Sequence, residues 1–127
     1  MIDAVIDVSH FNGSPDWATV KASGILGVVH KATQGAKEID KTFTTAQKAI
    51  PIAGLLFGAY HFATGDESGA AQADFFLSVV KPTPQTLVVI DFEPNPSGTS
   101  MSLDQLFGWI ETVQKALGRA PIVYGGK

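Results

Sequence analysis

The chain has 127 residues, of which 45% are hydrophobic and 17% are charged, and its formal net charge is −3. This length predicts one domain with a substantial core, and the acidic balance argues against nucleic-acid binding because no basic stripe is available to neutralise phosphates. The sequence contains no cysteine, which excludes disulfides, thiolate catalysis and zinc–cysteine sites.

Strand-like runs alternate with helical patterns along the chain. In order we expect a strand over 4–8, a helix over 14–24, a strand over 25–31, a helix over 41–50, a strand over 54–62, a helix over 70–80, a strand from Leu87, a helix over 102–118 and a strand from Ile122. Ser14 is expected to cap the first helix, with Pro15 in its first turn, and Ser102 and Gln105 resemble a capping box. This alternation indicates right-handed β-α-β crossovers and a mostly parallel sheet.

The last helix carries two kinds of apolar residue. We expect it to bury a face formed by Leu103, Leu106, Phe107, Ile110, Val113 and Leu117. Trp109 lies one residue off that face, and we interpret it as a core residue, whereas Trp17 in the first helix fits either the core or the rim.

The N-terminus and the longest apolar stretch bear on localisation. The segment 1–4 has no basic region and leads into no apolar signal segment, so the sequence does not indicate an export route. The stretch 49–63 is interrupted by Pro51, two glycines, Tyr60 and His61, and it is too short to span a bilayer. We therefore expect no membrane span.

Two carboxylates, Asp91 and Glu93, follow the apolar run 87–90 and are the most informative feature of the sequence. Leu-Val-Val-Ile is typical of a strand buried on both faces. Because side chains alternate along a strand, Asp91 and Glu93 should project to one side and Phe92 to the other, before Pro94 ends the pairing. The two acids thus stand where a buried strand opens into a loop, which is where α/β folds carry their chemistry.

These acids could instead cap the following helix or pair with a lysine. Their position on one face favours the catalytic alternative, because flexible side chains can bring the two carboxyl groups within the separation that glycosidases use. Like charges that close raise the proton affinity of one acid, which suits a general acid working near neutral pH.

Polar residues also lie at the ends of the other expected strands. Asp7 ends the first, Lys31 the second, Tyr60-His61 the third and Tyr124 the last. Each has a structural explanation when taken singly: a capping acid, a solvated cation, a core ring with a satisfied hydroxyl group, or a buried neutral imidazole. Together they predict one rim of a barrel, the face at which barrels carry active sites, and rings with polar neighbours suit a sugar-binding groove.

Other chemistries are represented more weakly. Ser9 and His10 are adjacent, but the sequence has no Gly-x-Ser-x-Gly elbow, no Gly-x-Gly-x-x-Gly motif and no phosphate loop. A divalent metal would find oxygen and imidazole ligands in a set made of Asp7, His61, Asp91 and Glu93. A metal-dependent carbohydrate deacetylase therefore stays open as an alternative, although no His-x-x-x-His pair is present.

Short segments in a fixed order carry a family resemblance. They are Ile6-Asp7-Val8-Ser9, Asp16-Trp17, Lys31-Ala32-Thr33-Gln34-Gly35, Gly54-Leu55, Gly58-Ala59-Tyr60-His61-Phe62, Ala71-Gln72-Ala73-Asp74-Phe75-Phe76, Ile90-Asp91-Phe92-Glu93 and Pro121-Ile122-Val123-Tyr124. In this order and spacing the chain resembles the glycoside hydrolases of family 25, the lysozymes that cleave peptidoglycan. The family often has Glu where Gln34 stands.

The resemblance implies an α/β fold, a TIM-like modified (β/α) barrel of eight strands. This chain would supply about the first five strands, so residues 1–127 are expected to form a single catalytic domain that is incomplete at its C-terminal end. The complete domain is expected to be a monomer. Loss of the closing strands would instead fit a non-catalytic, peptidoglycan-binding remnant, whereas retention of Asp7, Asp91 and Glu93 argues for an enzyme.

The resemblance also implies roles for individual residues. Glu93 resembles the general acid/base that protonates the oxygen leaving between N-acetylmuramic acid and N-acetylglucosamine. Asp91 resembles the residue that orients the substrate's own acetamido group for attack on the anomeric carbon, a substrate-assisted reaction that retains configuration. Asp7 resembles a buried acid that supports these two. The residues expected to bind substrate are Tyr60, Lys31, His61 and Tyr124.

The resemblance implies neither a metal nor an organic cofactor. The expected partner is bacterial cell-wall peptidoglycan, and the expected place of action is the cell wall, outside the cytoplasm.

Overall fold

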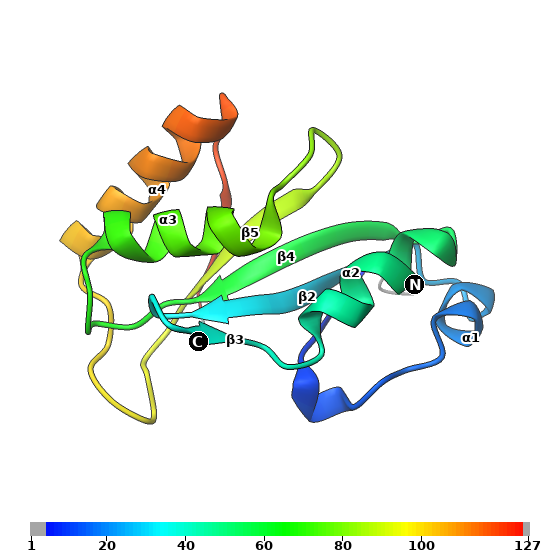
Figure 1. Ribbon diagram of the computed structural model, residues 1–127. Helices are drawn as coiled ribbons and strands as arrows, with labels where there is room; N and C mark the ends of the chain where they lie inside the picture. Colours follow the sequence, from blue (N-terminus) through cyan, green and yellow to red (C-terminus); the bar gives the residue numbers. More distant parts are fainter. Residues whose placement is uncertain (1–4, 126–127) are drawn as a thin grey trace.

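A curved sheet forms the centre of the computed structural model, which describes residues 5–125 (Figure 1). Its strands are β1 (Val5–Val8), β2 (Gly27–Gln34), β3 (Glu38–Ile39), β4 (Leu56–Phe62), β5 (Leu87–Phe92) and β6 (Ile122–Gly125). The order is β1-β2-β4-β5-β6 with all neighbours parallel, and β3 pairs antiparallel with β2. The expected parallel α/β architecture is confirmed, whereas β3 was not expected.

Helices connect the strands, and the longer ones pack over one face of the sheet (Figure 1). They are the short 3₁₀ helix η1 (His10–Asn12), α1 (Trp17–Ala22), α2 (Phe43–Ile52), α3 (Gly69–Val80) and α4 (Leu103–Leu117). None of the helices within residues 5–125 has the length and apolar character needed to cross a membrane.

The core lies between the sheet and these helices. One cluster joins β4 and β5 to α3 and α4, and its largest members, Phe76, Ile90 and Trp109, are fully buried. A second cluster joins β1 and β2 to α2 through residues such as Val28 and Ile50. Burying each such side chain stabilises the fold by about 1.5–3 kcal/mol, so the helices hold one face of the sheet rigid. The core position expected for Trp109 is confirmed, and Trp17 packs partly buried against the second cluster.

The expected inward face of α4 is confirmed for Leu106, Ile110, Val113 and Leu117, which pack against the core, but not for two other residues. Leu103 and Phe107 are exposed, and Trp109 is fully buried. The helices α3 and α4 cross closely, and a Cβ atom on Gly69 would overlap the carbonyl oxygen of Gln105. The crossing brings the backbone of Trp109 close to Gly69, and the Trp109 side chain is buried in the core. The Ser102–Gln105 capping box and the left-handed Gly118 at the helix end are both confirmed.

The beginning of α1 was predicted wrongly. The structure begins this helix at Trp17 and places Asp16, not Ser14, at the N-cap. The Asp16 carboxylate accepts hydrogen bonds from the backbone N–H groups of Ala18 and Thr19, which satisfies two donors that Ser14 lies too early to reach. Of the first expected strand, residue 4 lies outside the described residues.

Candidate active site

Acidic, basic and aromatic side chains gather on the sheet face opposite the helices. They line a hollow of about 460 Å³. Six of the seven residues expected at the site lie there: Asp7, Lys31, Tyr60, Asp91, Glu93 and Tyr124. The hollow is therefore built from the carboxyl ends of strands that are distant in the sequence, as the strand-end pattern predicted.

Strand register explains why these side chains meet. Lys31 on β2 lies opposite Tyr60 on β4, and Asp91 on β5 lies opposite both Phe62 on β4 and Tyr124 on β6. Residues directly opposite each other project to the same face of a sheet. Asp91 and Glu93 consequently share the hollow, whereas Phe92 packs against the helix-side core, as the alternation along β5 predicted.

Asp91 has the most strongly perturbed carboxyl group of the site. Burial is the largest cause, the negative charge of Glu93 and a hydrogen bond shared with it follow, and together they raise the pKa of Asp91 to about 7 against the opposing effect of Lys31. One of its oxygens, Oδ1, is buried and has no hydrogen-bond partner among residues 5–125. Near neutral pH the two acids can therefore share one proton, which gives the site a proton donor and a carboxylate at the same time.

Tyr60 contributes a hydroxyl group that stays protonated. Burial and then the negative charges of Asp7 and Asp91 raise the pKa of Tyr60 above its ordinary value. Its phenol can thus donate a hydrogen bond into the hollow near neutral pH.

Asp7 was expected to be buried, and that expectation is wrong for this structure. Its side chain is exposed because β1 is an edge strand, which pairs only with β2 among the described strands. Asp7 nevertheless lies near enough to Asp91 and Tyr60 for its charge to raise the pKa of both groups.

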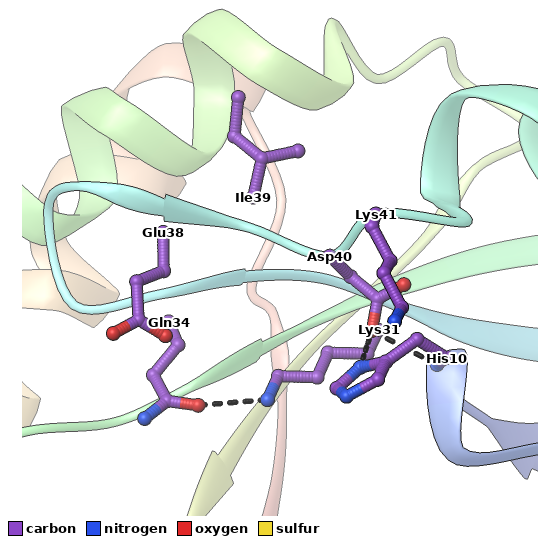
Figure 2. Close-up of a pocket in the computed structure, with 7 residues that line it drawn as sticks. All are labelled: His10, Lys31, Gln34, Glu38, Ile39, Asp40 and Lys41. Atoms are coloured by element: carbon purple, nitrogen blue, oxygen red, sulfur yellow. Dashed lines mark hydrogen bonds and ion pairs between the residues drawn. The ribbon is translucent and has the colours of Figure 1, made fainter.

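Lys31 is held on the rim by its neighbour Gln34. Its Nζ atom donates a hydrogen bond of 2.7 Å to Oε1 of Gln34 (Figure 2) and lies 5.2 Å from the centre of the Phe62 ring. Residues three apart on a regular strand face opposite sides, but a register shift between Lys31 and Thr33 turns Gln34 to the side of Lys31. This register shift, a β-bulge, therefore gives the Lys31 ammonium group a hydrogen-bond acceptor. Because the acceptor is a neutral amide, it does not cancel the positive charge of Lys31.

His61 is the expected site residue that the structure does not bring to the hollow. It is fully buried among the helices, where its ring stacks on Trp109 with 5.7 Å between centroids. Its Nε2 lies 2.9 Å from Oε1 of Gln72, an acceptor, so Nε2 carries the proton and Nδ1 accepts from the Thr33 hydroxyl group at 2.7 Å. Burial lowers the pKa of His61 to about 4, which keeps the ring neutral.

The position of His61 also bears on the metal alternative. It places the imidazole on the opposite side of the sheet from Asp7, Asp91 and Glu93, so the ligand set considered from the sequence is not assembled. Within residues 5–125 no other cluster of three histidine or acidic side chains has a geometry that could hold a metal ion.

Three further polar or aromatic side chains line the hollow and were not expected at the site from the sequence: Ser9, Phe11 and Phe62. The first two belong to the turn after β1, where Ser9 and Asn12 form a capping box around η1. A serine followed three residues later by asparagine, directly after an expected strand, is the signal that would have revealed this turn.

Comparisons with known proteins agree with this geometry. The family model described as "Glycosyl hydrolases family 25" matches residues 6–127. "Lysozyme M1" of Streptomyces globisporus is 41% identical over 113 residues, which cover 83% of this chain and 38% of that protein. The "N,O-diacetylmuramidase" of Chalaropsis sp is 28% identical over an alignment of 138 positions, and the match covers 93% of this chain and 63% of that protein.

Solved structures show the same relationship. The bacterial lysozyme from Streptomyces coelicolor has a TM-score of 0.89 and 33% identity, and the match covers 98% of this chain and 64% of that one. The chain thus spans less than two thirds of the length of the relatives named here. The likeness confirms the expected fold class, because the curled parallel sheet corresponds to part of the lysozyme fold.

Proposed function

Because the chain belongs to the glycosyl hydrolases of family 25, we propose that it carries the catalytic site of a peptidoglycan hydrolase. The bond cleaved is the β-1,4 bond between N-acetylmuramic acid and N-acetylglucosamine. The observation that carries this proposal is the Asp91–Glu93 pair, whose mutual repulsion and burial hold a shared proton inside a hollow lined by aromatic and polar groups. The relatives named as lysozymes and muramidases support the same activity.

The shared proton divides the roles of the two acids. A substrate acetamido group that donates its N–H to Asp91 would stabilise the ionised form of that carboxylate and so leave the proton on Glu93. Glu93 then protonates the leaving oxygen while the acetamido oxygen attacks the anomeric carbon. The ionised Glu93 afterwards takes a proton from the water molecule that opens the resulting oxazolinium ring, so the configuration is retained.

The other residues of the hollow bind and position the sugar in this proposal. Tyr60 offers a hydroxyl donor, Lys31 a cation, and Tyr124 an aromatic ring beside Asp91. Asp7 contributes negative charge that strengthens the hold of Asp91 on its proton. His61 acts from behind the sheet by packing against Trp109, not by touching substrate.

Residues 1–127 are, in this proposal, the N-terminal part of a single catalytic domain that acts as a monomer on bacterial walls, outside the cytoplasm. The share of the relatives' length that the chain covers and the open sheet of residues 5–125 support this view. The same two observations are equally compatible with the second candidate, a peptidoglycan-binding remnant without catalysis.

Clearing of bacterial cell-wall suspensions by the gene product that carries these 127 residues tests the proposal. Glu93→Gln should lower the clearing rate by about 10²- to 10⁴-fold, the usual cost of removing a general acid, while the circular dichroism spectrum is unchanged. Glu111→Gln, an exposed acid on α4, is the matched control. Clearing by the Glu93 variant within a few-fold of the parent would contradict the role of Glu93. A parent protein that pellets with walls but never clears them would instead support the binding remnant.

A further inference from the structure

An exposed aromatic ring stands on the rim of the acid-bearing hollow. The side chain of Phe11 is 84% exposed, and it lines the same hollow as Asp91 and Glu93. We propose that Phe11 is a stacking platform for one sugar ring of a glycan chain, at a subsite removed from the bond that is cleaved. This inference rests on the proposed function, because it concerns the substrate of that same hollow.

The backbone beneath the ring is fixed by its own hydrogen bonds. The hydroxyl oxygen of Ser9 accepts from the Phe11 N–H at 3.2 Å, and the Ser9 N–H donates to Oδ1 of Asn12 at 2.9 Å. This capping box closes η1 directly after β1, so the ring is presented from a rigid turn. An aromatic side chain that is already held rigid loses little conformational entropy when it binds a ligand.

The Phe11 ring also packs against the ring of His10. The two rings lie 4.1 Å apart between centroids and are tilted by 35°. His10 is in turn anchored to Asp40, whose Oδ2 accepts both the His10 backbone N–H at 3.0 Å and Nδ1 at 2.7 Å (Figure 2). The other oxygen of Asp40 accepts from the N–H and the hydroxyl group of Thr42.

Asp40 keeps its charge under all ordinary conditions. Burial would raise its pKa, but the hydrogen bonds from His10 and Thr42 outweigh burial and lower the pKa of Asp40 to about 2. The support of Phe11 therefore runs from an ionised, fully buried carboxylate at the start of α2, through His10, to the exposed ring. Such an anchored chain of contacts distinguishes Phe11 from the isolated surface hydrophobes that are common on soluble proteins.

The place of β1 in the strand order separates Phe11 from the two acids, Asp91 and Glu93. Phe11 follows β1, and the order β1-β2-β4-β5 places that strand three spacings from the acids on β5. Three strand spacings correspond to about 14 Å measured along the sheet. On this strand order the proposal assigns to Phe11 a different sugar ring from the one attacked at Glu93. The apolar face of a sugar suits an aromatic surface, and Tyr124 offers a second ring at the opposite edge.

Binding of β-1,4-linked N-acetylglucosamine oligomers tests this inference, with the catalytically silent Glu93→Gln protein as the parent. An aromatic contact of the usual strength predicts that Phe11→Ala weakens binding of the tetramer by about 3- to 10-fold, and that Phe11→Trp restores it. A dimer bound beside the acids on β5, three strands from Phe11, should have similar affinity for both proteins. Phe107→Ala, an equally large exposed ring on α4, is the matched control and should change neither affinity.

Asp40→Asn tests the supporting chain in the same assay. If Asp40 acts by positioning Phe11, the effects of Asp40→Asn and Phe11→Ala on tetramer affinity should not add. Equal tetramer binding by Phe11→Ala and its parent would overturn the platform while leaving wall clearing, and so the proposed function, intact. Failure of the Glu93→Gln parent to bind the tetramer, together with failure of the protein that retains Glu93 to clear walls, would overturn both.

Discussion

The raised pKa of Asp91 makes the folded protein less stable as the pH rises from about 4 to about 7. Its pKa in the folded protein is about 7, against 3.8 for the free side chain, so the folded state binds this proton more tightly than the unfolded state does. The stability that this proton contributes is fully present below about pH 4 and is lost as the pH rises through 7. Asp91→Asn, which has no proton to lose, should therefore stabilise the protein at pH 8 and change little at pH 4.5.

The size of the effect follows from the pKa difference. A rise of roughly three units corresponds to about 4 kcal/mol, and solvent screening of this half-buried group reduces the figure to about 2 kcal/mol. For a chain of this length, about 2 kcal/mol corresponds to an increase in Tm of roughly 6–10 °C. The buried Oδ1 atom that has no partner within residues 5–125 points in the same direction, because an uncompensated acceptor is costly to keep charged.

Thermal melts followed by circular dichroism at pH 4.5, 6 and 8 measure this difference. The Tm of the parent should fall relative to that of Asp91→Asn as the pH rises from 4.5 to about 7, with a large part of the fall before pH 6, and should then level off. Asp74→Asn, an exposed acid on α3, controls for the general effect of removing a negative charge. If Asp91→Asn melts below the parent at pH 8, or if the difference between them does not depend on pH, Asp91 does not carry the perturbed proton.

Two further predictions concern catalysis and assembly. Asp91→Asn should lower kcat far more than it raises KM, because the carboxylate is proposed to act on the acetamido group in the transition state. For the same reason de-N-acetylated walls should be poor substrates of the parent protein. Equal cleavage of acetylated and de-N-acetylated walls would contradict the substrate-assisted mechanism. The 127 residues alone should self-associate, and sizing chromatography would detect this. The reason is that exposed apolar edges pair with other chains, and the edge strands β1 and β6 expose the apolar side chains of Val5, Ile122, Val123 and Tyr124. A monomer with a sharp thermal melt would contradict this prediction.

Local patterns were sufficient to predict the centre of the site. The apolar run before Asp91 predicted a buried strand, and alternation along it predicted that Glu93 would share its face. The same alternation, applied to β4, would have corrected the expectation for His61, since adjacent residues of a strand cannot both face the hollow. Tyr60 takes the hollow side, so His61 must enter the core.

Other features depend on contacts between distant segments and could not be predicted locally. The exposure of Asp7 follows from the place of β1 at the edge of the sheet, which its own sequence does not encode. The close crossing of α3 and α4 at Gly69 likewise depends on a contact between distant segments. Which acid holds the shared proton depends on the relative burial of Asp91 and Glu93, a property of the folded hollow and not of their spacing.

The bulge in β2 connects one of these non-local features to the chemistry. Without the register shift after Lys31, Gln34 would face the helices and Lys31 would lack its acceptor on the rim. Gln34 is neutral, so its hydrogen bond fixes the ammonium group without cancelling its charge. That charge opposes the effects of burial and Glu93 on Asp91 and draws the pKa of Asp91 downward, toward neutrality. A local irregularity of one strand thereby helps to keep the proton of the acid pair exchangeable at the pH at which a wall hydrolase would work.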